Sequence, residues 1–353
     1  MSNKILFILK HRESYGLPYG YTLSSGLYNS ANFVCQMLQR NNVNAKLVEV
    51  VDNNSIDKEV ALFQPNIVII EAYWVVPEKF DILHKLHPNV KWVVRAHSEL
   101  PFLANEGIAM DWTKRYYDRI SDNLVLAFNS KRTRDDIANI LSVQFPDALP
   151  EDIDSNIIYL PNYYPVTNKE VRFDDMEDGT IDVGCFGAIR PMKNHLTQAV
   201  AALKYADDNG LNLNFHINKG RIERGDEVYK NLVALFNGLP SPRYNLIEHK
   251  WLKHSDFIKV VRQMDIGLQV SFSETFNIVA ADLVDNGIPI VTSNQIKWVS
   301  SRFYADPTDV NDIVKKISRA INFKRLSPID INKKRLKKYC QASKSIWLDF
   351  CNE

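Results

Sequence analysis

The sequence predicts an α/β protein with two parallel sheets, each covered by helices on both faces, and three observations carry this prediction. Short apolar segments alternate with segments whose apolar residues recur at helical spacing, the order typical of βαβ units. The alternation occurs in two series, which a polar and acidic stretch at 168–180 separates. At 353 residues, of which 45% are hydrophobic, the chain is long enough for two domains.

The first series predicts a Rossmann-like unit over the first half of the chain. Its first strand, 4–10, precedes a helix at 27–40 in which Leu27, Val34 and Leu38 belong to an apolar stripe. Further strands are expected at 46–51, 66–71, 91–97, 124–129 and 157–160. Helices are expected at 54–63, 78–87, 111–122 and 131–141.

The second series repeats this architecture without repeating the sequence. Strands are expected at 181–186, 211–217, 244–248, 266–270 and 288–291. Helices are expected at 195–208, 226–236, 255–263 and 309–321, with a basic helix at 333–350. The predicted domains are therefore an N-terminal Rossmann-like domain at 1–167, a linker at 168–180, a C-terminal Rossmann-like domain at 181–330, and a terminal basic helix at 331–353.

Composition favours a globular protein of the cytoplasm. No apolar run approaches the roughly 20 residues that a membrane span needs. The apolar run at the N-terminus ends at Lys10 and reads as a buried strand, not as a signal peptide. Four scattered cysteines show no metal-ligand spacing, which fits free thiols in a reducing compartment.

The net charge of +1 conceals a strongly basic stretch. Residues 315–344 contain eleven Lys and Arg and one acid, Asp330, so this stretch has a net charge of +10 and the rest of the chain −9. A solvated helix face is the ordinary meaning of such a run. The alternative is a surface that binds an anionic or phosphate-rich partner.

The most specific pattern lies at 270–293, VSFSETFNIVAADLVDNGIPIVTS. It predicts the end of a strand, a polar loop, a helix opened by Glu274, a stop at Gly287 and a second strand. Free N–H groups at the start of such a helix suit anionic or hydroxyl-rich ligands. An ordinary βαβ unit with a helix-capping Glu is the alternative interpretation.

This segment resembles the donor-site signature of GT-B glycosyltransferases, especially the retaining enzymes of family 4. That signature has a Glu, a Gly-Phe-Gly-like turn, a second acid eight positions after the first, and a Gly-x-Pro-Val strand. Here the order is Glu274, a turn around Phe276, Asp282 and 287–290. The two glycines are replaced by Thr and Asn, and the second Glu by Asp. The passage at 159–162 similarly resembles the Pro-Asn-Gly hinge of these enzymes, with Tyr163 in the Gly position.

A second loop, Gly-Ala-Ile-Arg-Pro-Met-Lys-Asn at 187–194, resembles the family's Gly-Arg-Leu-x-x-x-Lys element. It follows a predicted strand, so its cations are expected at the carboxyl edge of the sheet, where open α/β sheets bind ligands. Lys193 matches the family's Lys, while Ala188 stands where an Arg is expected, and Arg190 is the substitute that we suggest. Both cations suit diphosphate oxygens. Exposed loop cations without a ligand are the alternative.

The resemblance implies the GT-B fold: two Rossmann-like domains that face a central cleft, with a C-terminal helix that crosses back to the N-terminal domain. The C-terminal domain would hold a nucleotide-sugar donor and the N-terminal domain its acceptor. The donor-binding residues would be Gly187, Arg190, Lys193, Glu274, Phe276, Asn277 and Asp282, with Asp282 at the ribose. The catalytic residues would be Glu274, Lys193 and His97, of which His97 would touch the donor sugar. A helix acid for Asp282 and a structural histidine for His97 are the alternatives.

The acceptor site has weaker signals. Tyr15 and Tyr19 would line it or merely cover a loop, and Glu99 would serve as a base if the enzyme inverts configuration. The resemblance instead implies retention, in which the leaving phosphate takes the acceptor proton. We expect no cofactor beyond a nucleotide-sugar co-substrate such as a UDP- or GDP-sugar, and no metal.

The identity of the acceptor stays open between a glycan, a small molecule and DNA. The sequence FGAIRPMKN at 186–194 and the compact, Asn-rich chain resemble those of phage-encoded glycosyltransferases, some of which modify hydroxymethylated bases in DNA. The basic stretch would then track a phosphate backbone, and a flipped base would enter the site. If phage-encoded, the enzyme would work in the host cytoplasm. A non-catalytic relative that binds a sugar nucleotide or DNA is the alternative from another class.

Overall fold

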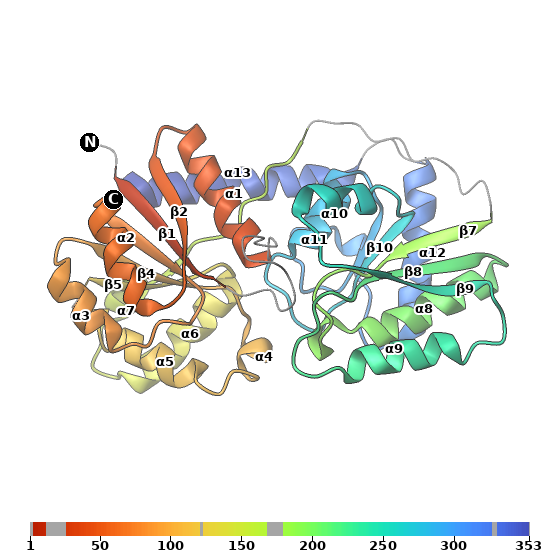
Figure 1. Ribbon diagram of the computed structural model, residues 1–353, viewed down its shortest axis with the longest axis horizontal. Coiled ribbons are helices and arrows are strands. Elements are labelled where there is room, and N and C mark those ends of the chain that lie inside the picture. The colour runs from red at the N-terminus through yellow and green to blue at the C-terminus, as the bar shows by residue number, and fades with distance from the viewer. Residues whose placement is uncertain (1–2, 12–25, 121–122, 168–178, 327–329, 353) are drawn as a thin grey trace. The chain divides into compact units, whose positions relative to one another are not determined.

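In a computed structural model of the protein, residues 3–11, 26–120, 123–167, 179–326 and 330–352 are described, except for the side chains of 325 and 326 (Figure 1). The chain forms two compact units. The first comprises Met1–Pro165 and Cys340–Glu353, and the second Val166–Tyr339. Nearly all of the predicted linker at 168–180 lies outside the described residues.

The first unit is built on one sheet of six parallel strands in the order β2-β1-β3-β4-β5-β6. The strands are β1 (Lys4–Lys10), β2 (Asn44–Val50), β3 (Ile67–Glu71), β4 (Lys91–Ala96), β5 (Leu124–Phe128) and β6 (Ile157–Tyr159). The helices are α1 (Gly26–Arg40), α2 (Ile56–Phe63), α3 (Lys79–Leu86), α4 (Leu100–Leu103), α5 (Ala109–Tyr117), α6 (Lys131–Gln144) and α7 (Pro150–Asn156). The sequence analysis missed α4 and α7, which are too short for helical periodicity to emerge.

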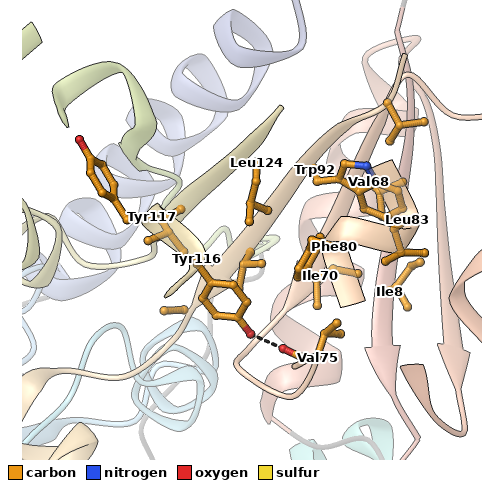
Figure 2. Close-up of a cluster of buried hydrophobic side chains, with 14 of the residues drawn as sticks. Ile8, Val68, Ile70, Val75, Phe80, Leu83, Trp92, Tyr116, Tyr117 and Leu124 are labelled. Atoms are coloured by element: carbon orange, nitrogen blue, oxygen red, sulfur yellow. Dashed lines mark hydrogen bonds between the residues drawn. The ribbon is translucent and has the colours of Figure 1, made fainter. Parts of the chain in front are cut away.

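Alternate side chains of these strands enter two separate cores, because successive residues of a strand point to opposite faces. Leu6, Ile70 and Trp92 pack on one face with residues of α2, α3, α5, α6 and α7. Figure 2 shows this core, in which the Tyr116 hydroxyl donates to the Val75 carbonyl. Phe7 packs on the other face with residues of α1 and of the C-terminal helix. Burial on both faces explains why these strands are almost uniformly apolar.

The second unit has a sheet of five parallel strands in the order β11-β10-β7-β8-β9. They are β7 (Thr180–Gly184), β8 (Asn212–Asn218), β9 (Tyr244–His249), β10 (Ile266–Gln269) and β11 (Ile290–Thr292). The helices are α8 (His195–Asp208), α9 (Glu227–Asn237), α10 (His254–Val261), α11 (Ile278–Asp285) and α12 (Val310–Leu326). Every strand and helix expected in this half is present.

The last helix, α13 (Ile331–Asn352), contributes to both units. Residues 331–339 belong to the second unit. Beyond them, Trp347 is fully buried in the first unit, where its ring centroid lies 5.8 Å from that of Phe7 and its indole nitrogen donates to the Pro161 carbonyl at 2.8 Å. A helix that returns to the N-terminal unit is therefore present, as the resemblance implied.

The order of strands fixes where each sheet is suited to bind a ligand. Open parallel sheets bind ligands beyond the carboxyl ends of their strands, at the point where the strand order reverses. In the second unit this point lies between β7 and β10, which pair directly. In the first unit it lies between β1 and β3, and residues 12–25, which follow β1, lie outside the described residues.

Two further expectations concern the whole chain. Among the described residues, no helix combines the length and the apolarity that a membrane crossing requires. All four cysteines are buried and none forms a disulfide. Burial raises the pKa of Cys35 to about 11 and the pKa of Cys185 to about 12, so these thiols stay protonated at neutral pH.

Candidate active site

The two loops that the sequence analysis singled out follow β7 and β10, the strands at the reversal point of the second sheet. Hydrogen bonds join them to each other. The Phe272 amide donates to the Met192 carbonyl at 2.9 Å, and the Asn194 side chain donates to the Val270 carbonyl at 3.1 Å. Gln198 of α8 ties both loops together, because it donates to the Lys193 carbonyl and accepts from the Val270 amide.

Lys193 and Glu274 form an ion pair where these loops meet. Their side chains are only 12% and 8% exposed, so most of the hydration of both charges has been removed. Removing one partner from such a pair leaves the other charge buried and uncompensated. The structure thus brings together the two residues that the sequence analysis assigned to one donor site, and their convergence on a bound sugar diphosphate stays a prediction.

Gly187 lies next to the Lys193 side chain and has a backbone conformation that favours glycine. Its φ of +118° is accessible to few residues other than glycine. A Cβ built on Gly187 would lie 3.8 Å from Lys193 Cε and 3.9 Å from Lys193 Nζ. The Gly187 amide donates to Asn218 Oδ1 at 2.9 Å, which fixes the loop to the end of β8.

Helix α11 begins four residues later than the sequence predicts. Asn277, not Glu274, is its N-cap, and the Asn277 side-chain oxygen accepts from the Ala280 amide at 2.9 Å. The prediction that Glu274 opens the helix is therefore wrong. The positive φ of Asn277 (63°) separates the loop from the helix, because a residue in this conformation cannot continue a right-handed helix. Gly287 ends the helix with φ of +76°, as expected.

Because α11 begins at Ile278, backbone N–H groups beside Glu274 have no acceptor within the helix. Among the residues that the structure describes, the N–H groups of Phe276 and Asn277 donate to no acceptor. Nearby, the Ser271 hydroxyl and both ring nitrogens of His195 are buried without a hydrogen-bond partner in the same part of the chain. Burial, aided by the charges of Lys193 and Arg190, lowers the pKa of His195 to about 3, so this ring is neutral. Buried polar groups of this kind are rare in native proteins and occur at sites that take a ligand or water.

The remaining donor-site predictions have different surroundings. Phe276 is fully buried against Trp298 and Tyr339, so it supports the loop from behind. Arg190 Nη1 donates to Glu223 Oε2 at 3.1 Å, and Arg221 also pairs with Glu223. Burial raises the pKa of Glu223, but these two guanidinium groups outweigh it and the net shift is downward.

Asp282 is buried, and its Oδ1 accepts from His254 Nε2 at 2.7 Å. Burial alone lowers the pKa of His254, but the hydrogen bond and charge of Asp282 outweigh burial and raise it. The ribose contact expected for Asp282 stays a prediction. The binding of a diphosphate by Arg190 also stays a prediction.

In the first unit, His97 belongs to a buried cluster that the sequence analysis did not identify. Arg95 Nη1 donates to both Glu71 oxygens at 3.1 Å, and His97 Nε2 contacts Glu71 Oε2. Burial raises the pKa of Glu71, but Arg95 and His97 outweigh burial and lower it. Burial and the charge of Arg95 lower the pKa of His97 against the opposing effect of Glu71. Glu71 is therefore a carboxylate and His97 a neutral imidazole.

These states define the tautomer of His97. A carboxylate only accepts, so Nε2 carries the proton that bonds to Glu71, and Nδ1 accepts from Asn129 Nδ2 at 3.3 Å. Both ring nitrogens are thus engaged inside the first unit. This geometry favours a structural role for His97, and its contact with a donor sugar stays a prediction.

Glu99 is the other predicted residue of the first unit, and it joins a different group. Its carboxylate accepts from the Ser130 hydroxyl at 2.6 Å, from Thr133 and from Arg132, all at the start of α6. A side chain that is 4% exposed and holds several donors is poorly suited to take a proton from an acceptor. This geometry favours a structural role for Glu99. Tyr15 and Tyr19 lie outside the described residues.

Among the described residues, no group of three or more His, Cys, Asp or Glu side chains is arranged to hold a metal ion.

The pair of Glu71 and Arg95 could have been predicted from a pattern in the sequence that the sequence analysis did not use. Each is a charged residue that follows an apolar run near the carboxyl end of its strand, and opposite charges at these ends of two neighbouring strands are expected to pair.

Comparisons with known proteins identify the fold. No protein-family model matches the chain, and no curated protein sequence matches it either. Among solved structures, a UDP-forming α,α-trehalose-phosphate synthase from Burkholderia vietnamiensis has a TM-score of 0.71 at 10% identity, over 99% of this chain and 96% of that chain. An α-glucosyltransferase in complex with UDP-glucose and DNA containing an abasic site has a TM-score of 0.66 at 12% identity, over 100% of both chains.

A third match is a variant of TarM from S. aureus in complex with fondaparinux, α-GlcNAc-glycerol and UDP. It has a TM-score of 0.59 at 16% identity, over 81% of this chain and 55% of that chain. With two Rossmann-type parallel sheets and these matches, the chain has the GT-B fold. This confirms the fold class that the sequence predicts.

Proposed function

We propose that this protein is a nucleotide-sugar-dependent glycosyltransferase whose second unit binds the donor. One observation carries the proposal. Lys193 and Glu274 meet at the reversal point of a parallel sheet, beside the unused N–H groups of Phe276 and Asn277. A cation and backbone donors suit a diphosphate, and a carboxylate suits sugar hydroxyls. The three solved relatives described above, each bound to or named for a UDP compound, support this choice of ligand class.

Donor binding then exchanges one partner of Lys193 for another. A diphosphate oxygen takes the place of Glu274 Oε1 at the ammonium group, and Glu274 turns to a hydroxyl of the sugar. The N–H groups at the start of α11 receive the phosphate charge, where the helix dipole also favours it. Gly187 allows the turn that brings the loop to Lys193, because its φ of +118° would strain any residue with a side chain.

In the reaction, the bond between the anomeric carbon and the phosphate oxygen breaks, and a bond from that carbon to the acceptor oxygen forms. The electron pair of the broken bond leaves with the nucleoside diphosphate, which takes the acceptor proton on a phosphate oxygen. Lys193 offsets the charge that develops on the leaving group, and Glu274 opposes positive charge at the anomeric carbon. Attack on the face from which the phosphate leaves retains the configuration, as we expect from the family resemblance.

A DNA acceptor is the second element of the proposal. The α-glucosyltransferase solved with DNA matches over the full length of both chains, whereas the TarM match covers 55% of that protein. The basic stretch at 315–344 supplies the cations that a polyanionic acceptor requires. With a glycan or small-molecule acceptor, the stretch would be a solvated helix face without a role in the reaction.

A melting-shift screen with UDP-, GDP- and ADP-sugars tests the donor site. A ligand at 100 times its Kd stabilises the protein by about 2.7 kcal/mol, which corresponds to roughly 5–11 °C for a domain of this size. We expect one sugar nucleotide to produce such a shift, and Lys193→Ala to abolish it. Lys219→Ala is the matched control, because Lys219 forms a surface pair with Glu248 in the same unit.

Transfer of radiolabelled sugar separates an enzyme from a non-catalytic relative. We expect donor hydrolysis or transfer in the wild type and its loss in Glu274→Ala. Unchanged turnover in both Lys193→Ala and Glu274→Ala would contradict the proposed site. Binding of a sugar nucleotide without any turnover would leave only a sugar-nucleotide-binding protein.

A further inference from the structure

Several exposed cations on the helices of the second half of the first unit and of the second unit are paired with an acid one turn away. Such pairs join Lys114 to Asp118, Arg115 to Asp111, Lys204 to Asp208 and Lys230 to Asp226. Pairs at this spacing stabilise a helix by about 0.2–0.5 kcal/mol each, and like charges destabilise it by a similar amount. The first turns of α13 depart from this pattern.

A group of five exposed cations surrounds the start of α13, and we call it the basic patch. Its members are Lys297, Arg302, Lys334, Arg335 and Lys338. Hydrogen bonds hold the segment 297–302 against the helix. The Ser300 amide donates to Asn332 Oδ1 at 3.0 Å, and Arg335 donates to the Trp298 carbonyl at 2.9 Å and to the Lys297 carbonyl at 3.4 Å. All five residues belong to the second unit.

Two features of the patch destabilise helix α13 when no partner is bound. Lys334 and Lys338 are like charges at i and i+4 on one helix face, and the first turn of α13 contains no acidic residue. Cations at a helix N-terminus also oppose its dipole. Among the described residues, no member of the patch forms an ion pair with an acidic side chain. The one acid beside the helix start, Asp330, accepts from the Lys333 amide with its carboxylate at 2.9 Å, so it caps the helix and does not pair with the patch.

We propose that the basic patch binds the phosphate backbone of duplex DNA. This inference rests on the proposed function, because it assigns the surface that holds a DNA acceptor. Duplex DNA has one negative charge per about 1.7 Å of its axis, so it can neutralise closely spaced cations together. A membrane surface fits less well, because helices that bind membranes combine cations with exposed apolar side chains. No large apolar side chain is exposed at 297–302 or 330–339.

The patch shares its scaffold with the loop that positions Glu274. Trp298 follows Lys297 of the patch in the sequence, and its indole nitrogen donates to the Phe276 carbonyl at 2.8 Å. Tyr339, next to Lys338, stacks on the Phe276 ring at 5.2 Å. A duplex bound at the patch would thus be held by the same packed group that fixes the donor loop.

The salt dependence of binding to a short unmodified DNA duplex tests the inference. Five neutralised phosphates give a slope of about −4.5 for the logarithm of the association constant against that of the salt concentration. Affinity would then fall about 500-fold between 50 and 200 mM salt. Lys334→Ala/Lys338→Ala is expected to reduce the magnitude of the slope by about 2. The matched control, Lys204→Ala/Lys230→Ala, removes two lysines of the same unit that are also exposed but paired, and it should leave the slope unchanged.

Four outcomes would overturn the inference. They are no retention on DNA by the wild type at low salt, an unchanged slope in the patch variant, an equal loss in the control variant, and patch-dependent binding to phosphatidylserine vesicles without binding to DNA. The donor site is measured separately by the UDP-induced melting shift. The patch variant should keep that shift, and Lys193→Ala should lose it while keeping the salt slope. A failed donor site and a failed patch therefore give different results.

Discussion

The ion pair between Lys193 and Glu274 makes a quantitative prediction about Glu274→Gln. The substitution keeps the shape of the side chain but removes its charge, so a nearly buried ammonium group loses its counter-charge. Breaking a buried pair from one side costs about 3–5 kcal/mol, and we take about 3 kcal/mol because the amide oxygen still accepts. At roughly 2–4 °C per kcal/mol, the variant should melt about 6–12 °C below the wild type.

The same substitution should strengthen the response to UDP. In the wild type the diphosphate must displace Glu274 from Lys193, whereas in the variant it supplies a counter-charge that is missing. UDP should therefore raise the melting temperature of the variant by more than that of the wild type. Transfer should nevertheless fall about 10²–10³-fold, the usual effect of removing one electrostatic contact to a transition state.

Differential scanning fluorimetry with increasing UDP concentrations measures both effects. Glu248→Gln is the control, because Glu248 pairs with Lys219 at 2.7 Å on the surface, where such a pair contributes only about 0–1 kcal/mol. A UDP-induced shift in Glu274→Gln that is no larger than in the wild type would refute the exchange of partners at Lys193.

Two further predictions concern buried charge. Glu71→Gln should destabilise the first unit by about 3–5 kcal/mol in urea denaturation, because Arg95 is fully buried, while Glu78→Gln at the exposed pair with Arg115 should change it by less than about 1 kcal/mol. A similar effect of both variants would contradict this reasoning. His254→Asn should lose stability that depends on pH. The pKa of His254 is raised in the folded protein, so its contribution is complete below the unfolded pKa of about 6.5 and disappears as pH rises through the folded pKa. The difference from the wild type in urea denaturation should therefore shrink as pH rises, and a difference that grows instead would contradict the pairing of His254 with Asp282.

The order of elements was predictable because buried parallel strands and amphipathic helices leave strong local patterns. Lys193 and Glu274 were also predictable as neighbours, since both follow strands that must meet at one edge of a sheet. The residue at which α11 begins was not predictable. Glu274 and Asn277 are both plausible helix caps in the sequence, and the choice depends on the positive φ of Asn277 and its hydrogen bond to Gln269.

The surroundings of single side chains were hardest to predict. Arg95 looked like an ordinary residue beside His97, yet it donates to Glu71 and to Asn162, which lies 67 residues further along the chain. Glu99 looked available at the end of a strand, but the hydroxyl groups that hold it come from α6. Such contacts depend on the packing of distant elements, which local periodicity does not encode.

The sharing of α13 between the units has a consequence for biosynthesis. The ribosome makes residues 1–165 before 166–339, but Trp347 and Phe350, which complete one core of the first unit, emerge only after both. Until then Phe7 and its neighbours lack two large aromatic partners, so the earlier unit finishes folding after the later one has been translated. A fragment that ends at residue 165 would lack these two aromatic side chains permanently. Adding residues 340–353 as a separate peptide should restore their packing.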